Sequence, residues 1–209
     1  MRRALAIGLL LAALGGCKVK EAPPITEPYK DDFSRADPGS DYYNTGGDYQ
    51  IVDGRLRAQK GYNHPLWLRK ALPHDVQIDV DVWAGTAIGD IKVEFFGDGK
   101  SHAFNKGAYT STGYVAVFGG WSNSRSILTR REEHGHQLSE DKTRRKVMPN
   151  HKYHWTIVRR GSQVSWSMDG QPFLTYDDPK PLAGPGHDHF AFASWESPTY
   201  FDNLVITPL

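Results

Sequence analysis

The sequence predicts an all-β domain built as a two-sheet antiparallel jelly-roll sandwich. Apolar and polar side chains alternate in residues 75–83, 91–96 and 164–168, which is typical of strands that bury one face. The chain has 21 glycines and 13 prolines, so turns are frequent. No window shows the apolar stripe of an amphipathic helix. Roughly ten or more short strands in about 180 residues favour a sandwich, with an up-and-down barrel as the competing architecture.

Asp-Gly pairs between the strand-like runs indicate tight turns, because this dipeptide tolerates positive φ. They are Asp53-Gly54, Asp98-Gly99 and Asp169-Gly170. Further strand-like runs are 50–59, 65–70, 113–118, 153–159, 173–176, 189–193 and 201–207. The polar stretch 119–152 holds only two short strand candidates, at 127–130 and 146–148. Residues 153–158 are apolar on both faces, which predicts a sheet with an aromatic ligand surface opposite the core.

The first 16 residues have the order of a secretory signal: Arg2 and Arg3, then an apolar run, then glycines. The apolar run is shorter than the ~20 residues of a membrane-spanning helix. Leu14-Gly15-Gly16-Cys17 resembles the bacterial lipobox, after which signal peptidase II leaves a lipid-modified cysteine. Cys17 is the only cysteine in the chain, although an ordinary signal peptide with a cysteine there by chance is the alternative.

We therefore expect a signal peptide at 1–16, a lipidated Cys17 and extended tether at 17–28, and the sandwich at 29–209. The prolines of residues 18–28 favour an extended tether. A lipid anchor places the protein on a membrane of the bacterial cell envelope. Lys18 follows the cysteine, which in the enterobacterial sorting rule resembles an outer-membrane destination.

Composition excludes several function classes. The formal net charge of +1 argues against a nucleic-acid partner held through phosphate charge. One cysteine excludes a disulfide scaffold and a cysteine-based zinc cluster. No nucleophile elbow, phosphate loop or dinucleotide fingerprint is present in the sequence.

Four segments resemble those of the concanavalin A-like lectin/glucanase superfamily. They are Asp31-Asp32-Phe33, residues 47–56 with Tyr49 at the usual tryptophan position, residues 164–170, and Phe201-Asp202-Asn203-Leu204. The resemblance spans most of residues 31–207 and implies a jelly roll. That superfamily includes lectins, glycosidases, polysaccharide lyases and adhesion domains, so it implies a sugar ligand without naming a reaction. The E-x-D-x-x-E signature of family 16 glucanases is absent from the sequence.

Aromatic and polar side chains near the strand ends are the candidates for ligand binding. Trp121 lies in a Gly-Gly-Trp-Ser-Asn-Ser-Arg segment, an unusual place for a purely core residue. Indole rings stack on sugar faces, while Asn and Arg hydrogen-bond the hydroxyls. The predicted ligand-binding residues are Trp121, Asn123, Arg125, Trp155 and Trp195, with Trp67 able to line the same surface. Core packing is the alternative for each tryptophan.

Two acidic pairs are candidates for catalysis. Glu132 and Glu133 lie in the densest cluster of ionisable residues and could supply a general acid or base, although a solvated loop would look the same. Asp79 and Asp81 share one strand face, as the carboxylates of a retaining glycosidase do. Their neighbours on that face are also polar, which favours a solvated outer sheet.

Asp32 and Asp202 are candidates for a structural Ca²⁺ site. The resemblance implies that the first and last strands pair, which would bring the two carboxylates together, and hard oxygen ligands suit Ca²⁺. The alternative is that each caps a turn. His187 and His189 could share a strand face, but no third ligand for a transition metal is obvious nearby.

The sequence therefore favours a lipid-anchored envelope protein whose sandwich binds a polysaccharide or related envelope glycan without catalysis. Two alternatives remain: a glycoside hydrolase or polysaccharide lyase outside family 16, and a structural or adhesion protein. Acids with shifted pKa beside aromatic rings in one groove would favour the enzyme. A sheet face filled by side chains, with no cleft, would favour the structural protein.

Overall fold

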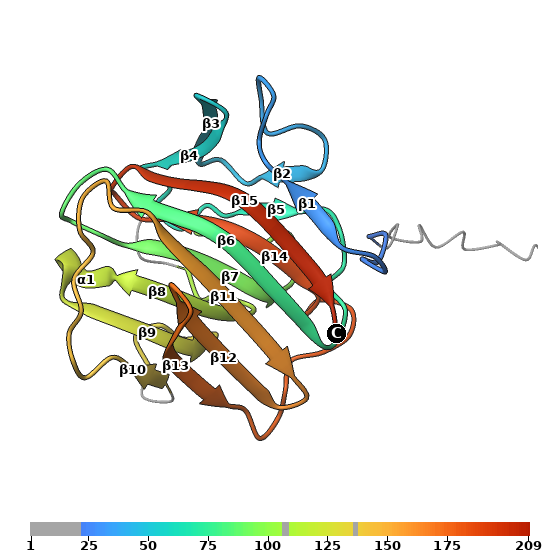
Figure 1. The fold of residues 1–209 in the computed structure, drawn as a ribbon. Coiled ribbons are helices and arrows are strands. Elements are labelled where there is room, and N and C mark those ends of the chain that lie inside the picture. The colour runs from blue at the N-terminus through green and yellow to red at the C-terminus, as the bar shows by residue number, and fades with distance from the viewer. Residues whose placement is uncertain (1–21, 106–108, 136–137) are drawn as a thin grey trace, which may run out of the picture.

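The computed structural model describes residues 22–105, 109–135 and 138–209. Two antiparallel sheets pack face to face, which confirms the predicted all-β sandwich (Figure 1). One four-residue helical turn, α1 (Gly120–Asn123), is the only helix in these three ranges. None of the described helices is long and apolar enough to cross a membrane. The predicted signal peptide and Cys17 lie outside the described residues.

The first sheet has eight strands, and β15, the last strand of the chain, lies near the centre of this sheet. The order is β13 (Gln171–Asp177), β12 (Gln163–Met168), β11 (Tyr153–Arg160), β6 (Val76–Ala84), β15 (Thr199–Pro208), β4 (Arg55–Gln59) and β3 (Asp48–Val52). The eighth strand, β1 (Tyr29–Asp31), also pairs with β15, with Lys30 opposite Val205. The two ends of the domain are thus held together by one ladder.

The second sheet has seven strands and carries α1 at one end. The order is β10 (Leu138–Glu140), β9 (Arg125–Arg130), β8 (Tyr114–Gly119), β7 (Ile91–Gly97), β14 (His189–Ser194), β5 (Leu66–Leu68) and β2 (Tyr42–Asn44). The strand expected at 127–130 is part of β9. The one expected at 146–148 is not a strand, because the Val147 backbone N–H bonds to the Asn123 side chain instead of a ladder partner.

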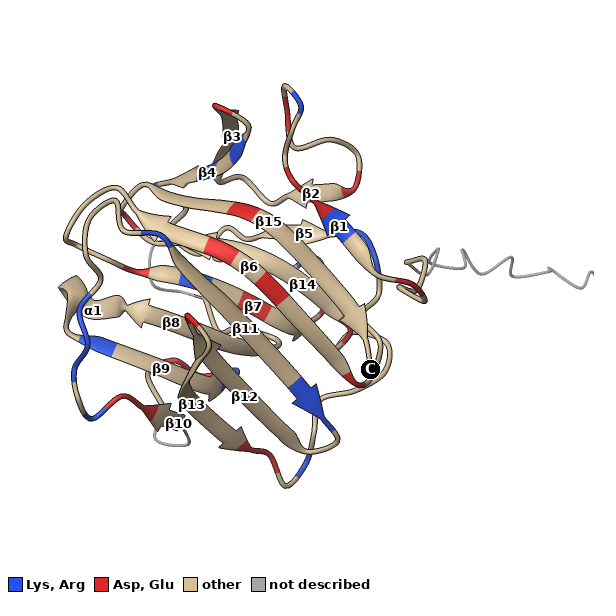
Figure 2. Ribbon diagram, viewed as in Figure 1, with Lys and Arg blue, Asp and Glu red and all other residues tan. Residues whose placement is uncertain are grey.

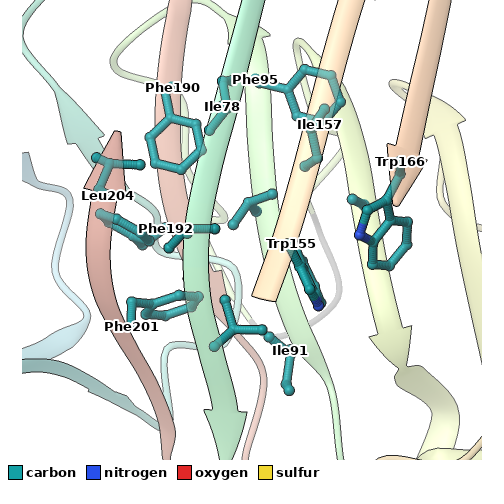
Figure 3. Packing of buried hydrophobic residues seen from close by; sticks show 14 of the residues in the cluster. Ile78, Ile91, Phe95, Trp155, Ile157, Trp166, Phe190, Phe192, Phe201 and Leu204 are labelled. Atoms are coloured by element: carbon teal, nitrogen blue, oxygen red, sulfur yellow. The ribbon is translucent and has the colours of Figure 1, made fainter. Parts of the chain in front are cut away.

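The core between the sheets is rich in aromatic rings (Figure 3). The Trp155 and Trp166 rings have centroids 4.4 Å apart, and both side chains are almost fully buried. The prediction that Trp155 contacts a ligand is therefore wrong: in β11 it points inward, because the alternation of that strand buries Tyr153, Trp155 and Ile157. Figure 3 shows the two indoles side by side in the core, on the other side of β6 from Phe192 and Phe201.

The two sheets differ on their outer faces. In β6 the polar residues Gln77, Asp79 and Asp81 remain partly exposed, as predicted for a half-buried strand. In β7 all seven residues are buried, including Lys92 and Glu94 on the outer face. Loops cover this face; the Trp67 indole, for example, donates to the Ser101 carbonyl at 3.0 Å. The seven-stranded sheet therefore has a second, partly polar interior on its outer side.

The described end of the predicted tether is docked on the domain. Ile25 is 5% exposed, and its N–H bonds the Ala71 carbonyl at 2.9 Å. The Ala71 N–H in turn bonds the Pro23 carbonyl at 3.0 Å. The chain therefore contacts the sandwich from Pro23 onward, before β1 begins.

Trp166 gives a direct test of the core. We expect Trp166→Ala to lower the free energy of unfolding by about 3–5 kcal/mol, because the neighbouring strands cannot close the cavity it leaves. Trp166→Phe should cost clearly less, since it fills most of that volume and removes an indole N–H with no hydrogen-bond partner among the described residues. Urea unfolding of both variants measures the difference, and equal losses would contradict this packing.

Candidate functional site

A pocket of about 350 Å³ opens on the outer side of the seven-stranded sheet. It lies where β7, β8 and β14 meet α1 and the loops that precede and follow these strands. Its lining residues are Asn63, Ile88, Asp90, Lys92, Val117, Gly120, Trp121, Ser122, Glu133, His134, Trp195 and Glu196. The strand register explains the floor, because Lys92 of β7 lies between Val117 of β8 and Ala193 of β14.

Lys92 is the ionic centre of the pocket. Its Nζ lies 2.9 Å from Glu133 Oε2, 3.3 Å from Asn63 Oδ1 and 3.9 Å from Asp90 Oδ1. The Lys92 side chain is only 7% exposed, so its charge is compensated by these groups more than by water. The three partners come from three different loops, which the ammonium holds against the sheet.

The two carboxylates around Lys92 have pKa values shifted in opposite directions. Burial raises the pKa of Asp90, and the Lys92 charge offsets this only in part. Burial also acts to raise the pKa of Glu133, but the closer Lys92 ammonium outweighs it and lowers that pKa. For Lys92 itself burial acts to lower the pKa, and the Glu133 and Asp90 charges reverse this and raise it. The pocket thus contains two acids of different strength.

Glu94 lies beside Lys92 on the same face of β7 and fastens a covering loop. It accepts hydrogen bonds from the Tyr109 hydroxyl at 2.5 Å and from the Thr112 and Gly113 N–H groups at 2.9 Å each. Burial raises its pKa in spite of these donors. Glu94 does not line the main pocket, and its contacts indicate a structural role.

Trp121 lines the pocket and lies in a backbone segment with strained φ angles. Trp121, Ser122 and Asn123 have φ of 51°, 57° and 58°, in the left-handed region that non-glycine residues seldom adopt. Such residues cost about 1–3 kcal/mol each and cluster at functional sites. The Trp121 side chain packs against the cluster of Val115, Val117 and Ile127 and is half-buried. This turn therefore presents the indole to the pocket at a conformational cost.

Asn123 and Arg125, which the sequence predicts as ligand contacts, lie next to Trp121 and do not line the pocket. The Asn123 amide donates to the Ala87 and Val147 carbonyls at 2.9 Å each, and its oxygen accepts the Val147 N–H at 2.8 Å. These bonds use the whole amide. The Arg125 guanidinium lies 4.7 Å from the Trp121 ring centroid and is paired with Glu140 at 2.9 Å.

Trp195, which directly follows β14, is the second tryptophan of the pocket. Its ring meets Tyr62 edge to face, with centroids 5.2 Å apart. Of the predicted tryptophans, Trp121 and Trp195 are thus brought together. Trp67, which we expected could join them, is fully buried under the loop that contains Ser101.

The structure separates the two predicted catalytic glutamates. Glu133 lines the pocket, whereas Glu132 does not. Glu132 is exposed, and its Oε1 accepts the His134 backbone N–H at 3.1 Å. Neighbouring residues in a loop point in different directions, and this decides which one reaches Lys92.

Asp79 and Asp81 alternate with the buried residues of β6, so they lie on the outer face of the eight-stranded sheet, and Figure 2 shows acidic positions along this strand. Neither residue lines the pocket. Asp81 is 2.9 Å from His154 and 3.2 Å from Lys152, and Asp79 accepts a hydrogen bond from Thr156 at 2.7 Å. Burial acts to raise the pKa of Asp81, but the hydrogen bonds from His154, Asn203 and Lys152 outweigh it and lower that pKa. This ion-paired surface agrees with the solvated face that the sequence favours.

Asp32 and Asp202, the predicted Ca²⁺ ligands, each accept a backbone N–H, from Ser34 at 3.0 Å and from Asn203 at 2.8 Å. Among the described residues, no group of three or more His, Cys, Asp or Glu side chains could hold a metal ion. The Ca²⁺ site stays a prediction.

Sequence reasoning missed Asp90, Lys92 and Asn63. Lys92 lies in an alternating run typical of a half-buried strand, and this pattern predicts an exposed side chain at its position. Asp90 and Asn63 both have positive φ, 68° and 64°, and both lie in loops without a motif. A usable signal is the length of the segment between β7 and β8, whose described residues Ser101, Tyr109 and Thr112 hydrogen-bond side chains of the outer face.

A family model described as "Farnesoic acid 0-methyl transferase" matches residues 91–203, more than half of the chain. The chain belongs to this family. The family match runs from the start of β7 into β15 and contains Lys92, Trp121, Glu133 and Trp195. No curated protein matches the chain.

Solved structures similar to this family member are β-sandwiches with low sequence identity. Carbohydrate-binding module CBM66 from Bacillus subtilis has a TM-score of 0.63 and 14% identity, covering 82% of this chain and 98% of its own. A putative glycosyl hydrolase from Parabacteroides distasonis has a TM-score of 0.57 and 16% identity, covering 86% and 94%. Alginate lyase Aly36B has a TM-score of 0.54 and 14% identity, covering 90% and 98%. These likenesses show the fold.

Lys92 gives a test of the electrostatics of the pocket. We expect Lys92→Met to destabilise the protein at neutral pH by on the order of 3 kcal/mol, because buried carboxylates lose their counter-charge. With its lowered pKa, Glu133 contributes stability above its ordinary pKa and loses it as the pH falls. In the variant burial would outweigh the smaller effect of His134 and raise the pKa of Glu133, so the stability that this group contributes would fall with rising pH.

The difference between wild type and Lys92→Met should therefore shrink from pH 7 to pH 4, as measured by thermal unfolding. Lys142→Met is the matched control, since Lys142 pairs with Glu140 at 3.4 Å but is 85% exposed. Its melting temperature should stay close to wild type at both pH values. A Lys92→Met deficit that is independent of pH would contradict the assignment.

Proposed function

We propose that this protein binds a carbohydrate in the pocket between Trp121 and Trp195, without catalysis. The observation that carries the proposal is the pairing of two indole rings with a polar floor in one open pocket. Indole faces stack on the C–H groups of sugar rings, and carboxylates and amides accept hydrogen bonds from the hydroxyls. Asp90, Glu133 and Asn63 supply such acceptors.

The similar structures support this direction. CBM66 is named a carbohydrate-binding module, and domain 4 of the arabinanase AbnA, with a TM-score of 0.51, is described in complex with arabinotriose. At 13–14% identity these two structures show only the fold. We therefore infer the ligand from the pocket of this chain. We also propose that this sandwich is of the concanavalin A-like type. This part of the proposal rests on the sequence motifs at residues 31–33, 47–56, 164–170 and 201–204. We do not extend the methyl transfer in the family description to this chain, because indoles around a polar floor match the recognition of a polyol.

A glycoside hydrolase or lyase is the second candidate, and the opposite pKa shifts of Asp90 and Glu133 favour it. An acid with a raised pKa beside one with a lowered pKa is the arrangement that general acid–base catalysis uses. Both side chains border the same pocket as the indoles. The shared Lys92 partner equally fits an ion-pair network that only shapes the pocket.

Glycan titration of tryptophan variants tests the binding function. On the best-binding oligosaccharide from a glycan array, Trp121→Ala and Trp195→Ala should each weaken affinity about five- to tenfold, the loss of roughly one stacking contact. Tyr200→Ala, which removes a ring stacked on Trp83 on the other sheet, is the control and should bind like wild type. Unchanged affinity in both tryptophan variants, measured by calorimetry, would remove this site.

The same glycan, assayed for new reducing ends, separates binder from hydrolase. Turnover by wild type that is lost in Glu133→Gln would promote the hydrolase. A parallel absorbance assay for an unsaturated product does the same for a lyase. The binding function predicts neither product.

Lipid anchoring through Cys17, at the bacterial outer membrane, completes the proposed function. Cys17→Ser should abolish incorporation of a fatty-acid analogue and shift the protein from the membrane to the soluble fraction, because the thiol carries the acyl chain. Equal label in wild type and variant would contradict the anchor.

A further inference from the structure

The charges that line the pocket determine which sugars it can take. We propose that the pocket selects glycans by charge: a hexosamine with a protonated amine binds most tightly, a neutral hexose less tightly and a uronate least. This inference rests on the carbohydrate-binding function proposed above and adds the class of ligand. It follows from three features of the site.

The first feature is that the cation of the pocket, Lys92, is already paired with carboxylates. Among the described residues that line the pocket, Lys92 alone is a lysine or arginine. An ammonium group has three N–H donors, and three oxygens surround this one, from Glu133, Asn63 and Asp90. Glu133 and Asn63 accept hydrogen bonds from Lys92, and the carboxylates of Glu133 and Asp90 already balance its charge, which leaves no uncompensated cation for a sugar carboxylate.

The second feature is the surplus of carboxylates. Asp90, Glu133 and Glu196 all line the pocket, so acids outnumber the lysine. Asp90 Oδ1 is buried and has no hydrogen-bond donor among the described residues, with Lys92 too distant at 3.9 Å to bond it. Glu196 is exposed to solvent at the same opening. His134 also lines the pocket, 3.7 Å from Glu133 Oε1, so the three carboxylates outnumber the two basic side chains, Lys92 and His134.

The third feature is the match between acceptors and donors. Ionised carboxylates only accept hydrogen bonds, so they favour ligands that donate, namely hydroxyl and ammonium groups. A protonated amine on the sugar adds charge complementarity, whereas a uronate brings a second carboxylate that repels the first. The Trp121 and Trp195 rings attract cations through their faces, which acts in the same direction.

Three matched tetrasaccharides test the order: β-1,4-linked glucosamine, glucose and glucuronate. We measure calorimetric affinities at about pH 6, where the amine is protonated and ordinary carboxylates are ionised. Glucosamine tetramer should bind about three- to fivefold more tightly than glucose tetramer, as a partly exposed ion pair allows. Glucuronate tetramer should bind weakest.

Single-residue variants test whether the acids of the pocket cause this order of affinities. Glu133→Gln keeps the side-chain volume, removes one charge and releases Lys92, so the affinity for the glucuronate tetramer should rise and that for the glucosamine tetramer should fall. Glu196→Gln, at an exposed position that does not contact Lys92, should reduce the glucosamine preference even if Glu133→Gln fails to fold. Glu132→Gln is the matched control, because this neighbouring acid lies outside the pocket. It should leave all three affinities unchanged.

Equal affinities, tightest binding of glucuronate, or no binding of any tetramer would overturn the inference, as would the same shift in Glu132→Gln. The carbohydrate-binding function is judged separately. An array ligand whose affinity depends on Trp121 and Trp195 preserves that function even when the charge order fails. An array with no ligand removes both.

Discussion

The site depends on one buried charge, the Lys92 ammonium on the outer face of the seven-stranded sheet. Left alone, a buried ammonium would cost several kcal/mol, so the fold must bring counter-charges to it. Glu133 comes from the β9–β10 loop, Asp90 from the β6–β7 loop and Asn63 from the β4–β5 loop. Three loops far apart in sequence therefore converge on β7 and build the pocket wall. With Trp121 and Trp195 at its border, the pocket has the walls and floor of a sugar site.

The fold could be predicted from sequence because strand alternation is a local property. The alternating residues of β6 and β11 bury the side chains that the pattern assigns to the core. The same pattern misleads in β7, where the side chains assigned to solvent are buried as well. Alternation says which residues share a face and says nothing about what covers that face. The cover comes from loops, such as residues 98–105 and 109–113, which carry no periodic signal.

The site could be predicted only in part, for the same reason. Trp121, Trp195 and Glu133 lie just beyond strand ends, and all three line the pocket. Trp155 lies within a regular strand and belongs to the core. Asn123 has the chemistry of a ligand contact, but its amide fastens the strained turn under Trp121. Long-range hydrogen bonds decided these roles, and no pattern in the sequence encodes them.

The central claim is that the glycan occupies the pocket over Lys92. A crystal structure of the protein soaked with its best-binding oligosaccharide tests this most directly. The account predicts sugar density between Trp121 and Trp195, with a hydroxyl or amine of the sugar within hydrogen-bond distance of Asp90 or Glu133. Density elsewhere, for example over Trp83 and Tyr200 on the eight-stranded sheet, with the pocket over Lys92 left without sugar, would contradict it.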